Sequence, residues 1–297
     1  MKIGAYIVVK NGSASICKVI RHHLDKQGFD VVIVVDNGST DDTARKVRSL
    51  NDSRVLLRRT EPKTGHLQHI FSTLAARELF QKHTCDWVVP IDSDEFWHSP
   101  RWGTVRNALF HAKKNAVRTR KTIHGLSTSE YRFYETALDD PDEDNFLRRL
   151  LYYKLSKQKK VIMHRLGELL HEVTFGNHSA DLKDGSIPPV FLETAADELV
   201  RFHYPHVNKK DLVKRTLDQV EGFLISSRGK WLAQDTESRL SAHFFQRYNL
   251  LKQGRLDAYY YKNLFLSGPQ VSSCIEKGTL FCTNAMHAFY PPDSADR

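Results

Sequence analysis

Short apolar runs alternate with segments of helical spacing along the first hundred or so residues. The runs rich in β-branched residues, which predict strands, lie at 3–9, 31–35, 55–57 and 87–91. The segments with an apolar residue every three or four positions, which predict helices, lie at 13–26, 43–50 and 68–81. The run VVIVV at 31–35 has no polar position, as expected of a strand buried on both faces of a sheet. This alternation predicts an open α/β sheet.

The pattern loosens beyond residue 100. Strands are expected within 116–134 and, mixed with loops, over 160–206. Helical spacing returns from Asn208, and the segments that predict two further helices are 235–253 and 256–266. The shift in pattern places a soft boundary near 205–230, between an α/β part and a helical C-terminal part.

The composition is that of a globular protein with one large or two small domains: 297 residues, 40% hydrophobic and 27% charged. No run of about 18 apolar residues predicts a spanning helix. The opening MKIGAYIVVKNGS fits a first strand better than a signal peptide, because it lacks a small-residue cleavage site. The four cysteines have no paired spacing, which argues against a zinc site and predicts a reducing, cytoplasmic location.

The net charge of +9 favours anionic partners such as nucleotides, nucleic acids, phospholipid surfaces or phosphorylated sugars. A generally basic surface is the plainer alternative. The basic clusters do not alternate with aromatic residues and match no nucleic-acid-binding motif, so we expect no nucleic-acid partner.

The fourth predicted strand ends in a cluster of acids, Asp92, Asp94 and Glu95. Ligands of open α/β sheets bind beyond the carboxyl ends of the strands. Two carboxylates in a D-x-D turn can converge on Mn²⁺ or Mg²⁺, which removes the cost of crowding like charges and neutralises a diphosphate leaving group. The alternative is an acidic turn that only solvates the strand end. The preceding βαβαβαβ pattern favours the cation site.

The second predicted strand ends directly in Asp36. The polar residues at 39–41 can cap the helix that starts near Thr43, and Gly38 permits the tight turn. Capping does not explain Asp36, which terminates a fully apolar strand. An acid in that position can accept a hydrogen bond from a nucleobase imide or a ribose hydroxyl, so Asp36 is a candidate donor-binding residue.

These motifs, in this order, resemble the family 2 glycosyltransferases of the GT-A fold. The matching segments are VVKNG at 8–12, IRHHLDKQGFDVVIVVDNGSTDDT at 20–43 and QHIFSTLAARELFQKHTCDWVVPIDSDEF at 68–96. The most similar branch has the pattern K-N-E, H-H, D-N-x-S-x-D-x-T and D-x-D-E-F. The resemblance is strong over residues 1–100, weaker over 150–215 and absent beyond about 230.

The resemblance implies a mixed sheet flanked by helices, with a helical C-terminal region packed on it. It implies a catalytic domain of residues 1–206, in which 1–100 bind nucleotide and 101–206 serve acceptor and metal, followed by residues 207–297. It also implies a nucleoside-diphosphate sugar donor, most often a UDP-sugar, a divalent metal (Mn²⁺ or Mg²⁺), a glycan or other hydroxyl acceptor, and inversion at the anomeric carbon.

Roles transfer residue by residue. Asp36 resembles the acid that contacts the donor base, while Asp92 and Asp94, with Ser93 between them, resemble the motif that holds ribose, metal and diphosphate. The residues that would line the base pocket are Val8, Lys10 and Asn11. The chain departs from the pattern at Gly12, where the branch commonly has glutamate.

The resemblance also offers two histidines as a third metal ligand. His178 lies in a segment similar to the strand-plus-histidine element of this branch, and His203 in one similar to its later H-Y-P segment. The chain has fifteen histidines, so packing or acceptor contacts are the competing roles for both.

A general base must lie within hydrogen-bond reach of the acceptor hydroxyl. Glu172 is one candidate, because HEV at 171–173 is not half of a zincin motif: position 175 is phenylalanine. Asp181, Asp184 and Glu95 are rivals. For Glu95 we favour a different role, as an acceptor of backbone N–H groups that organises the D-x-D turn.

Two surfaces remain open to interpretation. Aromatic residues that could stack on a sugar, although core packing is favoured for most, are Trp97, Trp102, Tyr131, Phe133 and Tyr134. The basic helical region 207–266 could make peripheral contact with an anionic membrane, on its inner face, but packing is favoured there as well.

Alternative functions are weaker. A sugar-phosphate nucleotidyltransferase usually has a glycine-rich phosphate loop after its first strand, whereas VVKNGSASI has a single glycine. A D-x-D-x-T/V phosphatase is disfavoured because Glu95 and Phe96 follow the second aspartate. A non-catalytic nucleotide-sugar binding module would show no activity even with metal.

Overall fold

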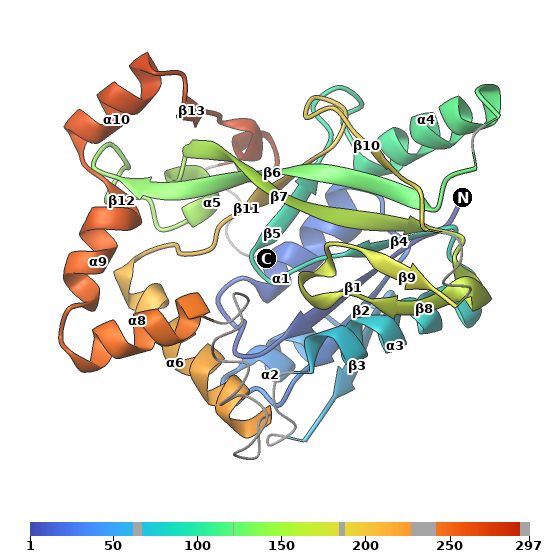
Figure 1. The fold of residues 1–297 in the computed structure, drawn as a ribbon, viewed down its shortest axis with the longest axis horizontal. Coiled ribbons are helices and arrows are strands. Elements are labelled where there is room, and N and C mark those ends of the chain that lie inside the picture. The colour runs from blue at the N-terminus through green and yellow to red at the C-terminus, as the bar shows by residue number, and fades with distance from the viewer. Residues whose placement is uncertain (62–66, 121, 184–187, 227–241, 292–297) are drawn as a thin grey trace. The chain divides into compact units, whose positions relative to one another are not determined.

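The computed structural model describes residues 1–61, 67–120, 122–183, 188–226 and 242–291 (Figure 1). The chain forms two compact units, the first made of residues 1–130 and 156–202 and the second of 131–155 and 203–297. Each compact unit therefore consists of two separate segments of the chain, and residues 131–155 group with the C-terminal part. The domains expected from the sequence, 1–206 and 207–297, are each one continuous segment. Those limits remain a prediction.

A mixed sheet forms the frame of the first unit. Its parallel strands, in sheet order, are β3 (Val55–Arg59), β2 (Val31–Asp36), β1 (Ile3–Val9) and β4 (Trp87–Pro90). The strands that extend it beyond β4, in order, are β7 (Tyr152–His164), β6 (Gly125–Thr136), β11 (Val200–His203) and β5 (Glu95–His98). β7 runs antiparallel to β4. The predicted open mixed α/β sheet of the GT-A type is confirmed.

The strand order turns at β1, with β2 on one side of it and β4 on the other. Val9 pairs with Asp36, and Tyr6 pairs with Pro90, so both neighbours end beside the carboxyl end of β1. Such a reversal is the topological switch point at which open α/β sheets bind ligands. Two acidic loops flank this point: the first comprises residues 36–41 at the end of β2, and the second comprises residues 92–95 after β4.

Burial follows the sequence pattern. Every residue of β2 is buried, and α3 (Gln68–Gln81) packs Ala75, Ala76 and Leu79 into the same apolar cluster as Ile33 and Val35. Burying one such large aliphatic side chain stabilises the fold by about 1.5–3 kcal/mol. The strand that ends in Asp36 is therefore held rigidly in place.

Helix boundaries differ from expectation at two places. The helix predicted over 13–26 starts later and divides into α1 (Ile16–Arg21) and a π-helical turn, η1 (His22–Lys26), because the amides of Ser15 and Ile16 form a turn on the Gly12 carbonyl. The strand expected within 116–134 is present, but only in the second part of that range. Residues 105–118 form α4 (Val105–Arg118), capped by Thr104, and β6 begins only at Gly125.

The second unit is mainly helical. Its helices are α5 (Phe146–Arg149), α6 (Lys209–Ser226), α8 (Ala242–Lys252), α9 (Leu256–Asn263) and α10 (Gly268–Glu276). Leu212, Leu256 and Tyr260 form a small core there with partly buried neighbours such as Leu250. The helix predicted over 256–266 ends at Asn263, since Phe265 and Leu266 pair with the end of β6 as β12 (Phe265–Leu266). Residues 235–241 of the other predicted helix lie outside the described residues.

Candidate active site

The second acidic loop, residues 92–95, is closed by hydrogen bonds between its first residue, Asp92, and its last, Glu95. Glu95 is the first residue of β5, and its backbone N–H donates to the carbonyl of Asp92 at 3.1 Å. In return the N–H of Asp92 donates to Oε2 of Glu95 at 3.1 Å. Glu95 therefore holds the D-x-D turn through both its backbone and its side chain, which is the organising role expected for it.

Two buried cations from distant strands hold these acids. Lys160 of β7 places its ammonium 2.6 Å from Oδ2 of Asp92 and 2.6 Å from Oε2 of Glu95. Arg201 of β11 donates to Oε1 of Glu95 at 2.6 Å and to Glu130 of β6 at 2.5 Å. Three carboxylates thus share these two cations.

The chemistry of this turn suits a divalent cation. The Asp92 side chain is 34% exposed, whereas the Glu95 side chain is 1% exposed. Burial and the adjacent Glu95 carboxylate raise the pKa of Asp92 above its ordinary value, against the opposing effect of Lys160. Asp94, which is buried like Glu95, adds a further carboxyl group to the turn. Crowded carboxylate oxygens are the ligands that Mn²⁺ and Mg²⁺ prefer, so the residues of this turn fit such an ion.

The first acidic loop is closed by local contacts. Asp36 is fully buried, and its Oδ1 accepts the N–H of Ser39 at 2.9 Å while its Oδ2 accepts Nε of Arg59 at 2.9 Å. Asp41 accepts the N–H of Thr43 at 3.0 Å, at the start of α2 (Thr43–Ser49). The loop is thus organised by residues close to it, and the Arg59 side chain remains 43% exposed.

The turn after β1 connects the two loops. The side-chain oxygen of Asn11 accepts the N–H of Thr40 at 2.9 Å, and the Asn11 N–H donates to the hydroxyl of Ser39 at 2.9 Å. On the other side, the Ser15 hydroxyl donates to the carbonyl of Ser93 at 2.5 Å. A side chain at Gly12 would meet a methyl carbon of Val9 at 2.4 Å and Ser93 at 3.3 Å, so the close approach of this turn leaves no room for the glutamate of the related pattern.

The remaining residues of the expected base pocket lie at the same edge. Val8 is partly buried against the apolar cluster of the sheet, and Lys10 is half-buried just beyond the end of β1. Their contact with a donor base stays a prediction.

His178 is exposed and contacts the residue that precedes Lys160. Its Nδ1 donates to the carbonyl of Lys159 at 2.5 Å, which leaves Nε2 with its lone pair. Histidines that bind metals commonly donate their other ring N–H to a backbone carbonyl in this way. His203 is the last residue of β11 and follows Arg201 by two positions, so both side chains leave the same face of that strand.

Two candidate bases lie opposite each other. Strands β8 (Leu170–Val173) and β9 (Ala180–Leu182) form an antiparallel pair in which Glu172 and Asp181 are direct partners. Directly opposite residues lie on the same face of the pair. The Glu172 side chain is 43% exposed and its carboxylate lies 3.9 Å from His69. Asp184 falls outside the described residues.

A histidine pair positions the strand that follows the D-x-D turn. The Nε2–H of His22 donates to the carbonyl of Trp97 at 2.9 Å, and Nε2 of His23 accepts the N–H of Trp97 at 3.2 Å. Burial lowers the pKa of His23 to about 4 and holds that of His22 well below its usual value. Both neutral rings therefore hold β5 through the backbone of Trp97. The H-H motif alone did not reveal this role.

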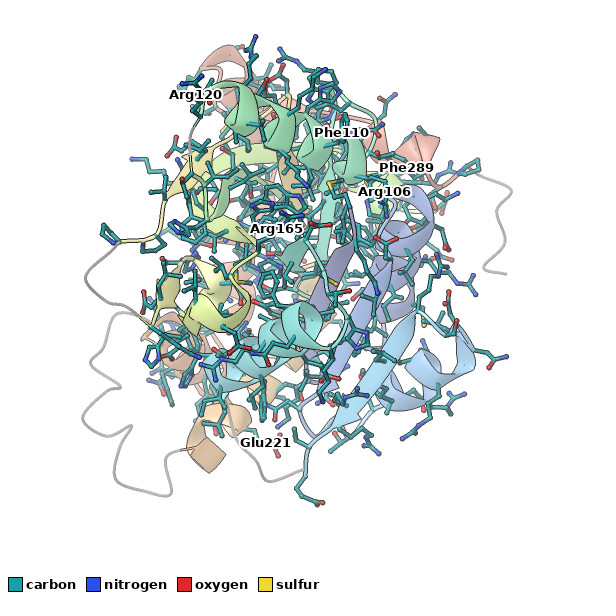
Figure 2. The ribbon with its side chains drawn as sticks, turned by 90° about the vertical axis from the view of Figure 1, so that its right-hand side faces the viewer. Arg106, Phe110, Arg120, Arg165, Glu221 and Phe289 are labelled. Carbon is teal, nitrogen blue, oxygen red and sulfur yellow. The ribbon has the colours of Figure 1, made fainter. Side chains whose placement is uncertain are left out.

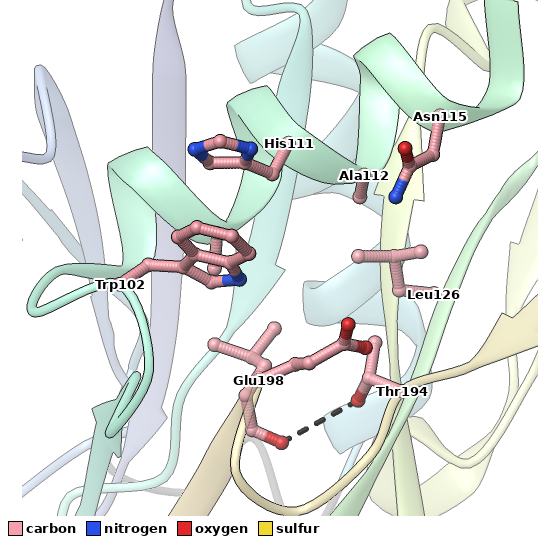
Figure 3. A pocket seen from close by; sticks show the side chains of 9 residues that line it. Trp102, His111, Ala112, Asn115, Leu126, Thr194 and Glu198 are labelled. Carbon is pink, nitrogen blue, oxygen red and sulfur yellow. Dashed lines mark hydrogen bonds between the residues drawn. The ribbon is translucent and has the colours of Figure 1, made fainter. Parts of the chain in front are cut away.

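A small cavity lies away from the acidic loops. The residues that line it are Trp102, Ala108, His111, Ala112, Asn115, Leu126, Thr194, Glu198 and Leu199 (Figure 3). Its volume of about 40 Å³ has room for a few waters, not for a sugar nucleotide. Trp102 stacks on His111 with ring centroids 3.7 Å apart, and Trp97 is fully buried. These two tryptophans pack within the fold.

Three charged residues of the site escaped sequence analysis: Glu130, Lys160 and Arg201. For Arg201 the available signal was a single cation inside the mostly apolar strand segment LVRFHY, whereas Lys160 ends the lysine-rich run KLSKQKK and gives no such signal. A cation in such an apolar segment is costly to bury unless it is paired, so its position alone indicates a buried acid nearby.

The fold and its acidic edge define the class: an open α/β protein with two acidic loops at a topological switch point, where such sheets bind ligands. The model of glycosyl transferase family 2 matches residues 5–177, more than half of the chain. The chain belongs to this family.

Curated relatives match over a shorter stretch. An uncharacterized glycosyltransferase of Rickettsia prowazekii (strain Madrid E) is 36% identical over 96 residues, 32% of this chain and 28% of that protein. One from Rickettsia typhi (strain ATCC VR-144 / Wilmington) is 35% identical over 96 residues, again 32% and 28%. The match therefore spans less than a third of either relative's length.

Solved structures match this chain at low identity and low TM-score. S. aureus TarS in complex with UDP-GlcNAc is 12% identical, covers 86% of this chain and 78% of its own, and has a TM-score of 0.37. Glucosyl-3-phosphoglycerate synthase from Mycobacterium tuberculosis, with Mn²⁺, UDP-glucose and phosphoglyceric acid, is 20% identical with 44% coverage of each chain and a TM-score of 0.28.

Proposed function

We propose that this protein is a metal-dependent glycosyltransferase that transfers a sugar from a nucleoside-diphosphate sugar, most simply a UDP-sugar, to an acceptor hydroxyl in glycan or polysaccharide assembly. The observation that carries the proposal is the pair of acidic loops at the switch point: Asp36 ends β2, and the Asp92 turn follows β4 on the other side of β1. Family membership supports the reaction class.

On the donor side, Asp36 receives the base, and Val8, Lys10 and Asn11 line its pocket. Asp36 already accepts from Arg59 and Ser39, and each carboxylate oxygen has a second lone pair for a base or ribose donor. Asp92 and Ser93 receive the ribose and the diphosphate.

Asp92, Asp94 and His178 would hold the metal, with His203 as the rival third ligand. A bound divalent cation supplies positive charge that stabilises the departing diphosphate. The carbonyl of Lys159 fixes the His178 ring in the tautomer that this role needs. With His178→Ala, the Mn²⁺ concentration for half-maximal UDP binding should rise about tenfold. An identical titration would transfer the role to His203.

The acceptor hydroxyl is deprotonated by Glu172 or its cross-strand partner Asp181, and attack from the face opposite the leaving group gives inversion. Glu172 and Asp181 are direct partners on adjacent strands, so a short shift in the position of the acceptor hydroxyl would change which of them acts as the base. Glu95 is the weakest candidate base, because both of its oxygens bind buried cations.

Donor hydrolysis, measured for several sugar nucleotides with and without Mn²⁺, tests the function. We expect release of nucleoside diphosphate that requires the metal, and a rise in melting temperature with Mn²⁺ and UDP together. Release of pyrophosphate from a nucleoside triphosphate would establish the nucleotidyltransferase alternative. Nucleotide-sugar binding without turnover under any acceptor would establish a binding module.

We also propose peripheral contact with an anionic membrane, through α4 of the first unit. This helix has no acidic residue, and Phe110 and Val117, seven positions apart on one face, are 54% and 73% exposed (Figure 2). Exposed basic residues flank them: Lys114, Arg118 and Arg120. An apolar ridge between cations fits an interfacial helix. Within the described ranges, every helix is too short or too polar to span a bilayer.

Vesicle flotation tests this contact. Phosphatidylglycerol vesicles should carry the wild type, neutral phosphatidylcholine vesicles should not, and Phe110→Asp with Val117→Asp should abolish flotation. Leu74→Asp is the matched control, because Leu74 on α3 is 56% exposed but has Glu78 nearby on its helix. Equal flotation of the double variant and the wild type would remove α4 from the proposal.

A further inference from the structure

Lys160 holds an unusual position for a lysine. Its side chain is 3% exposed, and its ammonium lies 2.6 Å from both Asp92 and Glu95. The preceding residue, Lys159, is 39% exposed and pairs with Glu193 on the other face of β7. Two successive lysines of β7 thus differ in burial: Lys159 lies at the surface, whereas the ammonium of Lys160 is buried against the D-x-D turn.

Burying an ammonium costs several kcal/mol unless carboxylates compensate it. At Lys160 the compensation comes from the same acids that the turn would offer to a metal. The two acids are not equivalent, because Glu95 also binds Arg201, whereas Asp92 is 34% exposed and faces the outside of the network. A cation arriving from solution therefore meets Asp92 first, and meets Lys160 there.

We propose that Lys160 is a built-in counter-cation of the donor site, which holds the Asp92 turn in place without metal and competes with a divalent ion for Asp92. This inference rests on the metal-dependent function proposed above. Lys160 is a positioning residue: it acts through Asp92 and Glu95. Its charge weakens the binding of a divalent ion to the protein alone.

The nucleotide changes this balance. A nucleoside diphosphate brings its own negative charge, so the ammonium and the divalent ion no longer have to share one carboxylate. Lys160 should therefore weaken binding of Mn²⁺ alone more than binding of Mn²⁺ in the presence of UDP. The protein then takes up metal together with donor, and the coupling works in both directions.

Isothermal titration of Mn²⁺ into the full-length protein tests the inference, with Lys160→Met as the variant and Lys157→Met, at an exposed position of the same strand, as the matched control. We expect Lys160→Met to bind Mn²⁺ alone at least about tenfold more tightly than the wild type, because a like charge within contact distance has been removed. Lys157→Met should bind as the wild type does. Lys160→Arg, which keeps the charge, should also bind Mn²⁺ weakly.

Stability gives a second readout. Without metal, Lys160→Met should melt below the wild type, and saturating Mn²⁺ should restore most of the loss. If Lys160→Met does not fold, Lys160→Gln serves in its place, because its amide can still donate one hydrogen bond to the turn without a charge. Lys160→Gln should show the same gain in Mn²⁺ affinity.

Unchanged or weaker binding of Mn²⁺ by a folded Lys160→Met or Lys160→Gln variant overturns the inference and leaves the proposed function intact, provided that the wild type binds UDP with Mn²⁺. Absence of Mn²⁺-dependent UDP binding by the wild type and both variants overturns the function and the inference together.

Discussion

The two acidic loops end neighbouring strands of one sheet, yet they are stabilised in different ways. The loop after β2 is closed by residues near it, since Asp36 binds Ser39 three positions away and Arg59 twenty-three positions away. The loop after β4 is closed by Lys160 and Arg201, which are 65 and 106 positions from Glu95. The first is a local turn with an exposed cation, whereas the second depends on the assembled sheet.

The difference suits different tasks. Arg59 is 43% exposed, so it has room to move if a donor base binds Asp36 as proposed, while Arg201 is 2% exposed and has no such freedom. A fixed carboxylate cluster is what a metal site requires, because ligands must be held within a fraction of an ångström. Five substitutions, one of them combined with a pH titration, test this contrast.

The largest effect should come from Asp94→Ala in the second loop. Loss of a metal ligand removes the charge that stabilises the leaving group, so we expect donor turnover to fall by about 10³-fold. Calorimetry should show no Mn²⁺-dependent UDP binding, with the melting temperature close to that of the wild type. Asp142→Ala, in an exposed acidic loop, is the control. Unchanged affinity for UDP with Mn²⁺ would remove Asp94 from the metal site.

Arg201→Met and Arg59→Met compare the two loops directly. Arg201→Met leaves Glu95 and Glu130 buried without their shared cation, which should cost about 3–5 kcal/mol of unfolding free energy. Arg59→Met removes one charged hydrogen bond from Asp36 and should cost about 1–2 kcal/mol. Urea denaturation measures both. Equal losses would mean that the second loop does not depend more strongly on its distant cations.

Acid should weaken the second loop through the histidines behind it. The folded-state pKa of His23 is about 4, below the unfolded value of about 6.5, so the unfolded state binds more protons between these values. The contribution of this histidine to the free energy of unfolding is fully present above pH 6.5. It decreases as the pH falls from 6.5 towards 4, by about 1.4 kcal/mol per pH unit for each such histidine. His23→Gln should reduce the slope by one proton in urea titrations from pH 6.5 to pH 4. A slope equal to that of the wild type would show that His23 titrates normally in the fold.

Asp36→Asn should give the smallest effect. The amide cannot accept at both positions as a carboxylate does, so UDP affinity should weaken about tenfold. Binding of Mn²⁺ alone should stay the same, because the proposed metal ligands Asp92 and Asp94 lie in the other loop. A loss of Mn²⁺ affinity in this variant would mean that the two loops form one electrostatic site.

Most local features followed from the sequence. The helix at 68–81 and the strand at 3–9 have the predicted limits, because their apolar periodicity is clear and turn residues bound them. No element was predicted over 101–115, although Val105, Ala108, Leu109 and Ala116 are spaced for the helix that the structure forms there.

The acids were found because an acid directly after an apolar strand is unusual within a short window of sequence. Their cations were not found, since Lys160 and Arg201 lie on strands whose pairing with β5 and β6 no local pattern specifies. Glu172 and Asp181 were named separately, and only the β8–β9 register revealed them as partners.

The sequence by itself determined the α/β alternation, the two acidic strand ends and the family, because each depends on neighbouring residues and their order. The tertiary structure alone decided which charges meet. An ion pair needs its atoms within about 4 Å, and that proximity is set by strand order and register across more than a hundred residues. The Asp92 turn is therefore visible in the sequence, whereas the lysine that occupies it is visible only in the fold.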